Sequence, residues 1–136
     1  MKFFVDSANI EEITKLKHLG LADGVTTNPS LILKAGRNFQ MIAKDICELI
    51  EGPVSLEVSS SSIDQMREES EKLKIISENV VVKLPMTWNG LKVCRDLANS
   101  GTKVNMTLCF TTNQAILAAK AGAEFVSPFV GRLDDT

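Results

Sequence analysis

The chain has 136 residues, with 15 Lys and Arg side chains, 17 Asp and Glu side chains and a formal net charge of −2. This length is enough for one domain with its own core, and 44% hydrophobic with 24% charged residues is typical of a globular protein. The charges nearly balance and the basic residues form no cluster, so the sequence does not indicate a surface that binds nucleic acid or a membrane. The apolar run at residues 3–5 is too short for a signal peptide, and no stretch has the length of a transmembrane helix.

Short apolar, β-branched segments recur along the whole chain and predict strands. The predicted strands are residues 3–6, 23–27, 54–58, 80–84, 103–107 and 124–127. Between them, apolar residues recur at helical spacing over residues 10–16, 42–50, 63–76 and 91–98, and a fifth helix is predicted after residue 111. Three pairs have the capping-box spacing at which a helix begins: Asn9 with Glu12, Ser62 with Gln65, and Thr111 with Gln114.

The alternation of strands and helices predicts a parallel sheet, and the absence of a linker predicts one domain over residues 1–136. Two α/β architectures fit, an open doubly wound sheet and part of a (β/α)8 barrel. Polar residues of catalytic type lie at or near the carboxyl end of each predicted strand. They are Asp6, Asn28, Glu57, Lys83, Asn105, Thr107 and Ser127. One such group per unit favours the barrel, in which all the strands end at a common mouth.

A complete (β/α)8 barrel has eight strands and typically about 200 residues or more. The sequence provides about six strands and five helices. We therefore expect the chain to be the N-terminal part of a longer barrel.

Lys83 is the strongest candidate for catalysis, because three valines precede it and Leu84 and Pro85 follow it. Burial in such an apolar strand disfavours a charged ammonium and favours the neutral amine, which can attack a carbonyl carbon. The alternative is a lysine at a strand end whose amine extends into solvent. Acidic and amide groups on the neighbouring strand ends favour the catalytic interpretation.

The other candidates suit proton transfer and substrate binding. Asp6 and Glu57 are carboxylates at strand ends, where they can transfer protons around an iminium; alternatively, Asp6 caps the first helix and Glu57 pairs with a surface lysine. Asn105 and Thr107 are two residues apart on one predicted strand, so they share a face and can hydrogen-bond a substrate or a water. Taken singly, each is a polar strand end. Arg132 can bind a phosphate, or it is an ordinary exposed arginine.

Motifs for cofactors and metals are absent from the sequence. No Gly-x-Gly-x-x-Gly, P-loop or metal-ligand spacing occurs, so no cofactor and no metal are expected. Cys47, Cys94 and Cys109 are odd in number, widely spaced and set in apolar segments, which predicts reduced thiols and a cytoplasmic location. His18, the only histidine, falls at the end of a predicted helix, where a helix-end or surface role is favoured over catalysis.

Four segments of the chain closely resemble the transaldolase family. They are FVDSAN at residues 4–9, GVTTNPSL at 24–31, VVKLP at 81–85 and SPFVGR at 127–132. The Thr-Thr-Asn-Pro-Ser block and the Lys-x-Pro strand are together highly specific, and the similarity runs in order along all 136 residues. The compact start resembles the small single-barrel subfamily, which also contains fructose-6-phosphate aldolases.

The resemblance implies a transaldolase of the pentose phosphate pathway, which moves a dihydroxyacetone unit from sedoheptulose 7-phosphate or fructose 6-phosphate to an aldose phosphate. It implies that Lys83 forms a Schiff base with the ketose C2 carbonyl and that Asp6 takes the proton of the C4 hydroxyl. It also implies that Glu57 and Thr107 hold a water for proton transfer. The positions that match substrate-binding residues are Asn28, Asn105 and Ser127 for the dihydroxyacetone hydroxyls and Arg132 for phosphate.

Four positions resemble transaldolases rather than the aldolases of the subfamily. They are Glu57, Asn105, Ser127 and Phe129, where the aldolases resemble Gln, Leu, Ala and Tyr. Fructose-6-phosphate aldolase is the close alternative, and an inactive fragment that acts only as an assembly module is an alternative of another class. Family members continue through two further strands, so the chain is expected to be C-terminally truncated. The resemblance also implies sugar-phosphate substrates and a homo-oligomer.

Overall fold

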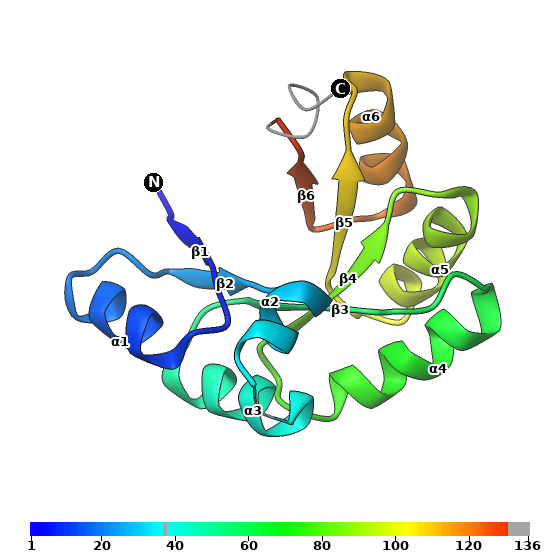
Figure 1. Ribbon diagram of the computed structural model, residues 1–136. Coiled ribbons are helices and arrows are strands. Elements are labelled where there is room, and N and C mark those ends of the chain that lie inside the picture. The colour runs from blue at the N-terminus through cyan, green and yellow to red at the C-terminus, as the bar shows by residue number, and fades with distance from the viewer. Residues whose placement is uncertain (37, 131–136) are drawn as a thin grey trace. The chain divides into compact units, whose positions relative to one another are not determined.

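The computed structural model describes residues 1–36 and 38–130, in which strands and helices alternate along the chain (Figure 1). The strands are β1 (Phe4–Asp6), β2 (Gly24–Thr26), β3 (Val54–Glu57), β4 (Val80–Pro85), β5 (Val104–Cys109) and β6 (Phe125–Pro128). The helices are α1 (Ile10–His18), α2 (Pro29–Lys34), α3 (Phe39–Leu49), α4 (Ile63–Lys74), α5 (Trp88–Asn99) and α6 (Thr112–Ala121). Every predicted strand is present, and each end lies within two residues of its prediction.

The strand order in the sheet is β1-β2-β3-β4-β5-β6, which is also the order of the strands in the chain. In a doubly wound sheet the strand order reverses at a switch point, whereas in a (β/α)8 barrel each strand pairs with the next one along the chain. The observed order excludes the doubly wound alternative. It confirms the expectation of a partial (β/α)8 barrel.

The described part of the chain contains six helices, one more than the five predicted. The additional helix, α2, has 6 residues and begins after Asn28, whose side-chain oxygen accepts a hydrogen bond from the Leu31 N–H at 2.9 Å. Pro29 lies in the first turn, where its missing N–H costs no hydrogen bond. A helix this short shows no apolar period, so only the Asn-Pro pair indicated its start.

Two compact units make up the described residues. The first consists of residues 1–57 and 72–81, and the second of residues 58–71 and 82–130. Strand β4 contributes Val80 and Val81 to the first unit and its other residues to the second. One domain over residues 1–136 stays a prediction.

In the first unit, β1, β2 and β3 are parallel neighbours, with Val5 paired to Val25 and Val25 to Val54. Helix α3 packs against β3, α1 and α2. Its buried side chains recur at helical spacing and are Ile42, Ala43, Ile46 and Cys47. The core of this unit therefore lies between the short strands and the apolar face of α3.

In the second unit, β4, β5 and β6 are parallel neighbours, with Val82 paired to Val104 and Asn105 to Phe125. Helix α5 packs against β5 and α6. Val93 and Cys94 on α5 and Met106 on β5 are fully buried. Helix α6 begins with the predicted capping box, and both of its hydrogen bonds are formed.

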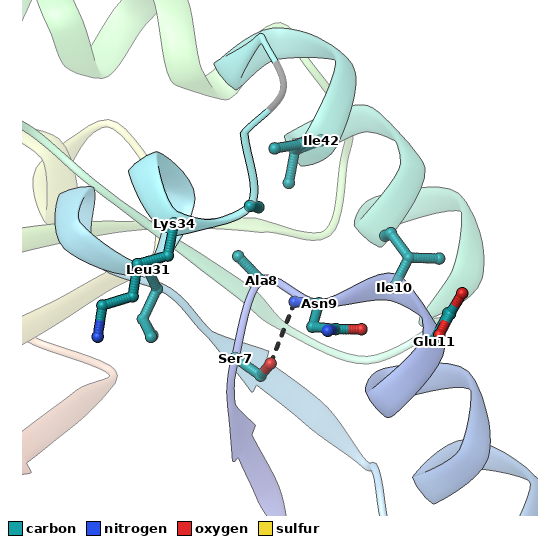
Figure 2. Close-up of a pocket in the computed structure, with 9 residues that line it drawn as sticks. Ser7, Ala8, Asn9, Ile10, Glu11, Leu31, Lys34 and Ile42 are labelled. Atoms are coloured by element: carbon teal, nitrogen blue, oxygen red, sulfur yellow. Dashed lines mark hydrogen bonds between the residues drawn. The ribbon is translucent and has the colours of Figure 1, made fainter.

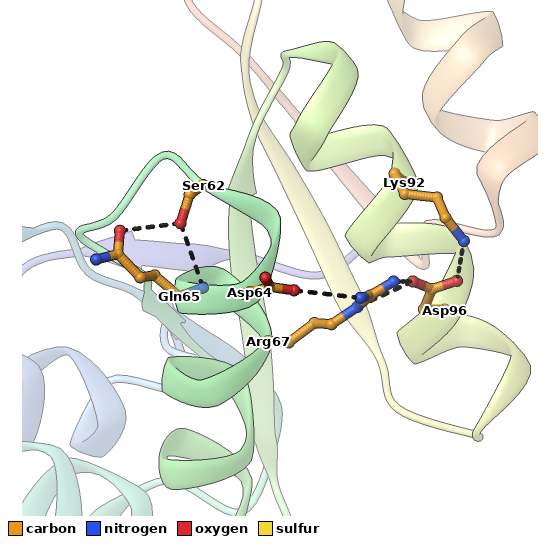
Figure 3. A network of polar contacts seen from close by, with 6 residues as sticks. All are labelled: Ser62, Asp64, Gln65, Arg67, Lys92 and Asp96. Atoms are coloured by element: carbon orange, nitrogen blue, oxygen red, sulfur yellow. Dashed lines mark hydrogen bonds and ion pairs between the residues drawn. The ribbon is translucent and has the colours of Figure 1, made fainter.

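Ion pairs connect α4 to α5 within the second unit (Figure 3). Nε of Arg67 donates to Oδ2 of Asp96 at 3.1 Å, and Nζ of Lys92 donates to Oδ1 at 2.6 Å. These hydrogen bonds, first from Lys92 and then from Arg67, hold the pKa of the Asp96 carboxyl below its usual range. One carboxylate thus binds cations from both helices.

No helix in the described ranges is long and apolar enough to cross a membrane.

Candidate active site

Lys83 lies in the middle of β4, and its side chain is only 3% exposed. Val82 before it and Leu84 after it are fully buried. The backbone carbonyl of Lys83 accepts a hydrogen bond from the Val58 N–H at 3.1 Å, which fixes the strand at this point. The alternative of a lysine that extends into solvent is therefore wrong. A lysine is rarely buried to this extent, and such positions are often functional.

Strand β5 places two of the predicted residues beside Lys83. Asn105 is the register partner of Lys83, and Thr107 is the register partner of Pro85. In-register neighbours on parallel strands share a face, so Asn105 and Thr107 lie on the face that carries Lys83. Asn105 is 2% exposed and Thr107 is 1% exposed. The second unit therefore gathers a buried amine, an amide and a hydroxyl.

Ser127 on β6 joins this group through a hydrogen bond. Its Oγ donates to Oδ1 of Asn105 at 2.8 Å. This bond holds the Asn105 amide in one orientation, because the amide oxygen is then the acceptor and the amide nitrogen remains the donor. Ser127 and Asn105 therefore form a connected polar pair in the second unit.

The hydroxyl of Thr107 is buried and has no hydrogen-bond partner within residues 1–36 and 38–130. Leaving a buried hydroxyl unpaired costs about 1–3 kcal/mol. Stable cores seldom contain such a group unless a ligand or a bound water satisfies it. Thr107 therefore has the property expected of a residue that awaits a ligand.

Asp6, Asn28 and Glu57 belong to the first unit. Asp6 is the last residue of β1 and accepts a hydrogen bond from Oγ1 of Thr26 at 3.0 Å. It does not cap the first helix, because Asn9 caps α1 and accepts from the Glu12 N–H. Whether the residues of the first unit meet those of the second stays a prediction, and Arg132 lies outside the described residues.

Two of these first-unit residues have structural contacts that the sequence indicated only in part. The Oδ1 atom of Asn28 is occupied as the cap of α2, where it accepts from the Leu31 N–H. Thr26, which was not a candidate, is the register partner of Asp6 and donates to it. Its place within the Thr-Thr-Asn-Pro block is the signal that would have identified it.

A separate pocket of about 530 Å³ lies within the first unit (Figure 2). Ser7 and Asn9 from the β1–α1 connection, Leu31 and Lys34 from α2, and Ile42 from α3 contribute to its walls. None of the predicted catalytic or substrate-binding residues within 1–36 and 38–130 lines it. The pocket is therefore a feature of the first unit alone.

Among the described residues, no three His, Cys, Asp or Glu side chains lie close enough together to hold a metal ion. Cys47, Cys94 and Cys109 are free and buried. Burial raises the pKa of the Cys47 thiol to about 11, with a further contribution from Glu48, and raises that of Cys94 to about 11. Cys47 and Cys94 therefore pack in the core and are poorly suited to act as nucleophiles.

A parallel sheet whose strand order follows the chain defines a protein of the (β/α)8-barrel class. Its candidate site lies toward the carboxyl ends of the strands. The chain belongs to the Transaldolase/Fructose-6-phosphate aldolase family, whose family model matches residues 3–136. This membership confirms the resemblance seen in the sequence.

Several relatives have closely similar sequences. A probable transaldolase of Dinoroseobacter shibae is 60% identical over 135 residues, which cover 99% of this chain and 62% of the relative. A probable transaldolase of Bartonella quintana is 62% identical over 135 residues, with the same two coverages. The probable transaldolase of Brucella anthropi is 58% identical over 136 residues. The chain thus spans about 62% of the length of the curated relatives that it matches.

A solved structure supports the fold alone. The carboxyl transferase domain of Rhizobium etli pyruvate carboxylase matches with a TM-score of 0.62 and 10% sequence identity. The match covers 98% of this chain and 30% of that chain.

Proposed function

We propose that the protein is a transaldolase that transfers a dihydroxyacetone unit from a ketose phosphate to an aldose phosphate through a Schiff base on Lys83. The observation that carries this proposal is the burial of Lys83, 3% exposed, in register with Asn105 and on the same face of the sheet as the unpaired hydroxyl of Thr107. A buried amine next to hydrogen-bonding groups is suited to attack a carbonyl. Family membership supports the same chemistry.

The proposed reaction begins when the amine of Lys83 attacks C2 of fructose 6-phosphate or sedoheptulose 7-phosphate. Loss of water from the carbinolamine gives the iminium. Asp6 then takes the proton of the C4 hydroxyl, the C3–C4 bond breaks, and its electron pair moves into the iminium to form an enamine. The aldose phosphate leaves, and the enamine carbon adds to the carbonyl of a second aldose phosphate. Hydrolysis of the new iminium releases the product and restores Lys83.

The other predicted residues are proposed to bind and to transfer protons. Glu57 and Thr107 would hold the water that enters and leaves during formation and hydrolysis of the iminium. The hydroxyls of the dihydroxyacetone unit would be bound by Asn28, Asn105 and Ser127, and phosphate by Arg132. The hydrogen bond between Ser127 and Asn105 supports a shared role for these two residues.

Borohydride reduction in the presence of fructose 6-phosphate tests the proposal, because it converts a Schiff base into a stable secondary amine. Intact-mass analysis should show one added sugar fragment on the wild-type protein and none on Lys83→Ala. Lys103→Ala is the matched control, since Lys103 is an exposed lysine next to β5. An adduct that persists in Lys83→Ala would show that another amine reacts and would reject the assignment.

Transfer is favoured over aldol cleavage by four residues of the transaldolase type. They are Glu57, Asn105, Ser127 and Phe129. A transferase needs an acceptor for turnover, so product should form from fructose 6-phosphate only when erythrose 4-phosphate is added. Release of free dihydroxyacetone without an acceptor would favour the aldolase. Absence of any adduct or product would favour an assembly module without activity. This alternative is tested because the chain spans only about 62% of the length of its relatives.

We also propose that the protein acts as a homo-oligomer in the cytoplasm. The resemblance to the small transaldolases supports the oligomer, and the three free, buried thiols suit a reducing compartment. Light scattering coupled to size-exclusion chromatography measures the assembly directly. A monomeric mass at every concentration tested would reject the oligomer.

A further inference from the structure

Leu108 adopts a left-handed backbone conformation, with φ at 59°. It is the only non-glycine residue with positive φ within residues 1–36 and 38–130. This conformation is unfavourable for a residue that carries a Cβ, and it persists only where the surroundings enforce it. Such residues gather at functional sites, so the position of Leu108 directly after Thr107 calls for a physical explanation.

The left-handed residue coincides with a bulge in β5. Met106 pairs with Val126 on β6, and the next pair is Cys109 with Pro128. Three residue steps on β5 therefore face two steps on β6, so β5 contains one additional residue. Leu108 lies inside this interval.

The bulge lets β5 satisfy different registers with its two neighbours. On the β4 side, the Met86 N–H donates to the Thr107 carbonyl at 2.8 Å, and Thr107 stays paired with Pro85. On the β6 side, the Phe129 N–H donates to the Cys109 carbonyl at 3.0 Å. Without the additional residue, one of these two registers would have to slip. A slip of one residue moves a side chain to the opposite face of the sheet.

We propose that Leu108 is a positioning residue, whose left-handed bulge keeps the Thr107 hydroxyl on the face of β5 that carries Asn105 and neighbours Lys83. The inference deepens the proposed function, on which its catalytic consequence rests. Leu108 acts through its backbone and touches no reacting atom, whereas Thr107 supplies the hydroxyl.

Two substitutions at position 108 separate a backbone role from a side-chain role. Val retains an apolar side chain but is β-branched, so it strongly disfavours the left-handed conformation. Asn removes the apolar side chain but tolerates that conformation. A backbone role makes Leu108→Val the more damaging change, whereas a packing role makes Leu108→Asn the more damaging one.

The first readout is the rate of borohydride-trapped adduct formation. We expect Leu108→Val to slow it roughly tenfold and Leu108→Asn to change it by less than about twofold, a difference that follows from the cost of left-handed backbone for a β-branched residue. In a Thr107→Val background, Leu108→Val should have no further effect, because a residue that acts only through Thr107 is then uncoupled. Additive effects, or a slower reaction of Leu108→Asn than of Leu108→Val, would overturn the proposal.

The second readout does not depend on activity. Amide hydrogen exchange should become faster at Met86 in Leu108→Val and remain slow in Leu108→Asn, since the Met86 N–H reports the bond to Thr107. If the wild-type protein forms no adduct, the proposed function fails, and the exchange rates still decide whether the bulge holds Thr107 in register. Leu108→Gly provides a folded comparison if Leu108→Val does not fold. Leu108→Gly should raise the unfolding temperature and keep hydrogen exchange at the Met86 N–H slow. Fast exchange at Met86 in this variant would overturn the inference.

Discussion

Thr107 and Thr27 are both buried threonines near strand ends, but only one of their hydroxyls is paired. Oγ1 of Thr27 donates to the Ser55 carbonyl at 2.8 Å, whereas Oγ1 of Thr107 has no partner in the described part of the chain. Thr27 is 0% exposed and Thr107 is 1% exposed, so bulk solvent reaches neither hydroxyl. The difference separates a structural threonine from one that is available to a ligand.

Substitution of each threonine by valine should therefore change stability in opposite directions. Thr107→Val removes an unpaired buried hydroxyl and should raise the free energy of unfolding by about 1 kcal/mol. Thr27→Val removes a hydrogen bond and should lower it by about 1 kcal/mol. Urea denaturation at pH 7 measures both values. Equal effects of the same sign would show that the Thr107 hydroxyl is hydrogen-bonded in solution. Slower adduct formation by Thr107→Val would link the unpaired Thr107 hydroxyl to function.

The buried thiols of Cys47 and Cys94 should be nearly inert toward iodoacetamide at pH 8 in the folded protein. Their pKa values are raised to about 11 by burial, whereas a thiol in an unfolded chain has a pKa of about 8.5. The thiolate fraction, and with it the alkylation rate, should be more than about a hundredfold lower than in urea. Peptide mapping after timed alkylation gives the rate for each cysteine. Rapid alkylation of either thiol without urea would contradict its burial.

The same two pKa values predict how stability responds to alkaline pH. Above about 8.5 the unfolded chain loses protons from its thiols while the folded protein retains them. Because the unfolded state then binds fewer protons, the free energy of unfolding should fall as the pH rises from about 8.5 toward 11. Cys47→Ala and Cys94→Ala should each weaken this decline in a series of urea titrations. A decline of unchanged steepness in both variants would assign it to other groups.

At the scale of the element, helix α5 approaches the end of β4 through Gly90. A methyl group at this position would overlap the carbonyl oxygen of Pro85, two residues after Lys83. The Gly90 N–H also donates to the capping hydroxyl of Thr87 at 2.9 Å. The absence of a side chain at residue 90 therefore allows the first turn of α5 to contact the strand that carries Lys83.

Gly90→Ala should destabilise the protein although alanine is the better helix former by about 1 kcal/mol. Overlap with a backbone oxygen cannot be relieved by a side-chain rotation, so the helix start or the end of β4 must shift, at a typical cost of about 1–3 kcal/mol. Asn99→Ala at the exposed end of α5 is the matched control and should be close to neutral. Thermal unfolding compares the two. A Gly90→Ala protein as stable as the wild type would show that α5 and β4 are less closely packed in solution.

At the scale of the whole molecule, one sheet order runs through two compact units. The order β1 to β6 follows the chain, and β4 contributes residues to both units. A strand shared in this way is expected to couple the unfolding of both units, because neither keeps its complete sheet without it. The prediction of one domain therefore becomes a prediction of one unfolding transition.

The buried thiols test this coupling, because Cys47 lies in the first unit and Cys94 in the second. Brief alkylation at a series of urea concentrations should give the same midpoint for both cysteines if the chain unfolds as one cooperative domain. Circular dichroism on the same samples supplies the midpoint for secondary structure. Separate midpoints for Cys47 and Cys94 would mean that the two units are independent domains.

Local sequence patterns were sufficient to predict the strands and five of the six helices in the described ranges. They also identified the polar residues near the carboxyl ends of the strands. These features depend on periodicity, capping and turn chemistry, which act between residues close in the chain. The polar residue at each strand end favoured a barrel, and motifs such as VVKLP identified the family. The short α2 was missed because only Asn28 and Pro29 indicate it.

The tertiary structure alone decided which of the candidate side chains are buried, paired or strained. No local pattern distinguishes Lys83 in an apolar core from a lysine that reaches solvent, because the answer depends on strands and helices distant in the chain. The same is true of the unpaired Thr107 hydroxyl and of the bulge at Leu108, which arises because β5 must satisfy the registers of two neighbouring strands at once. Sequence determined the elements and the family, and long-range packing determined which groups of the site are buried, paired or strained.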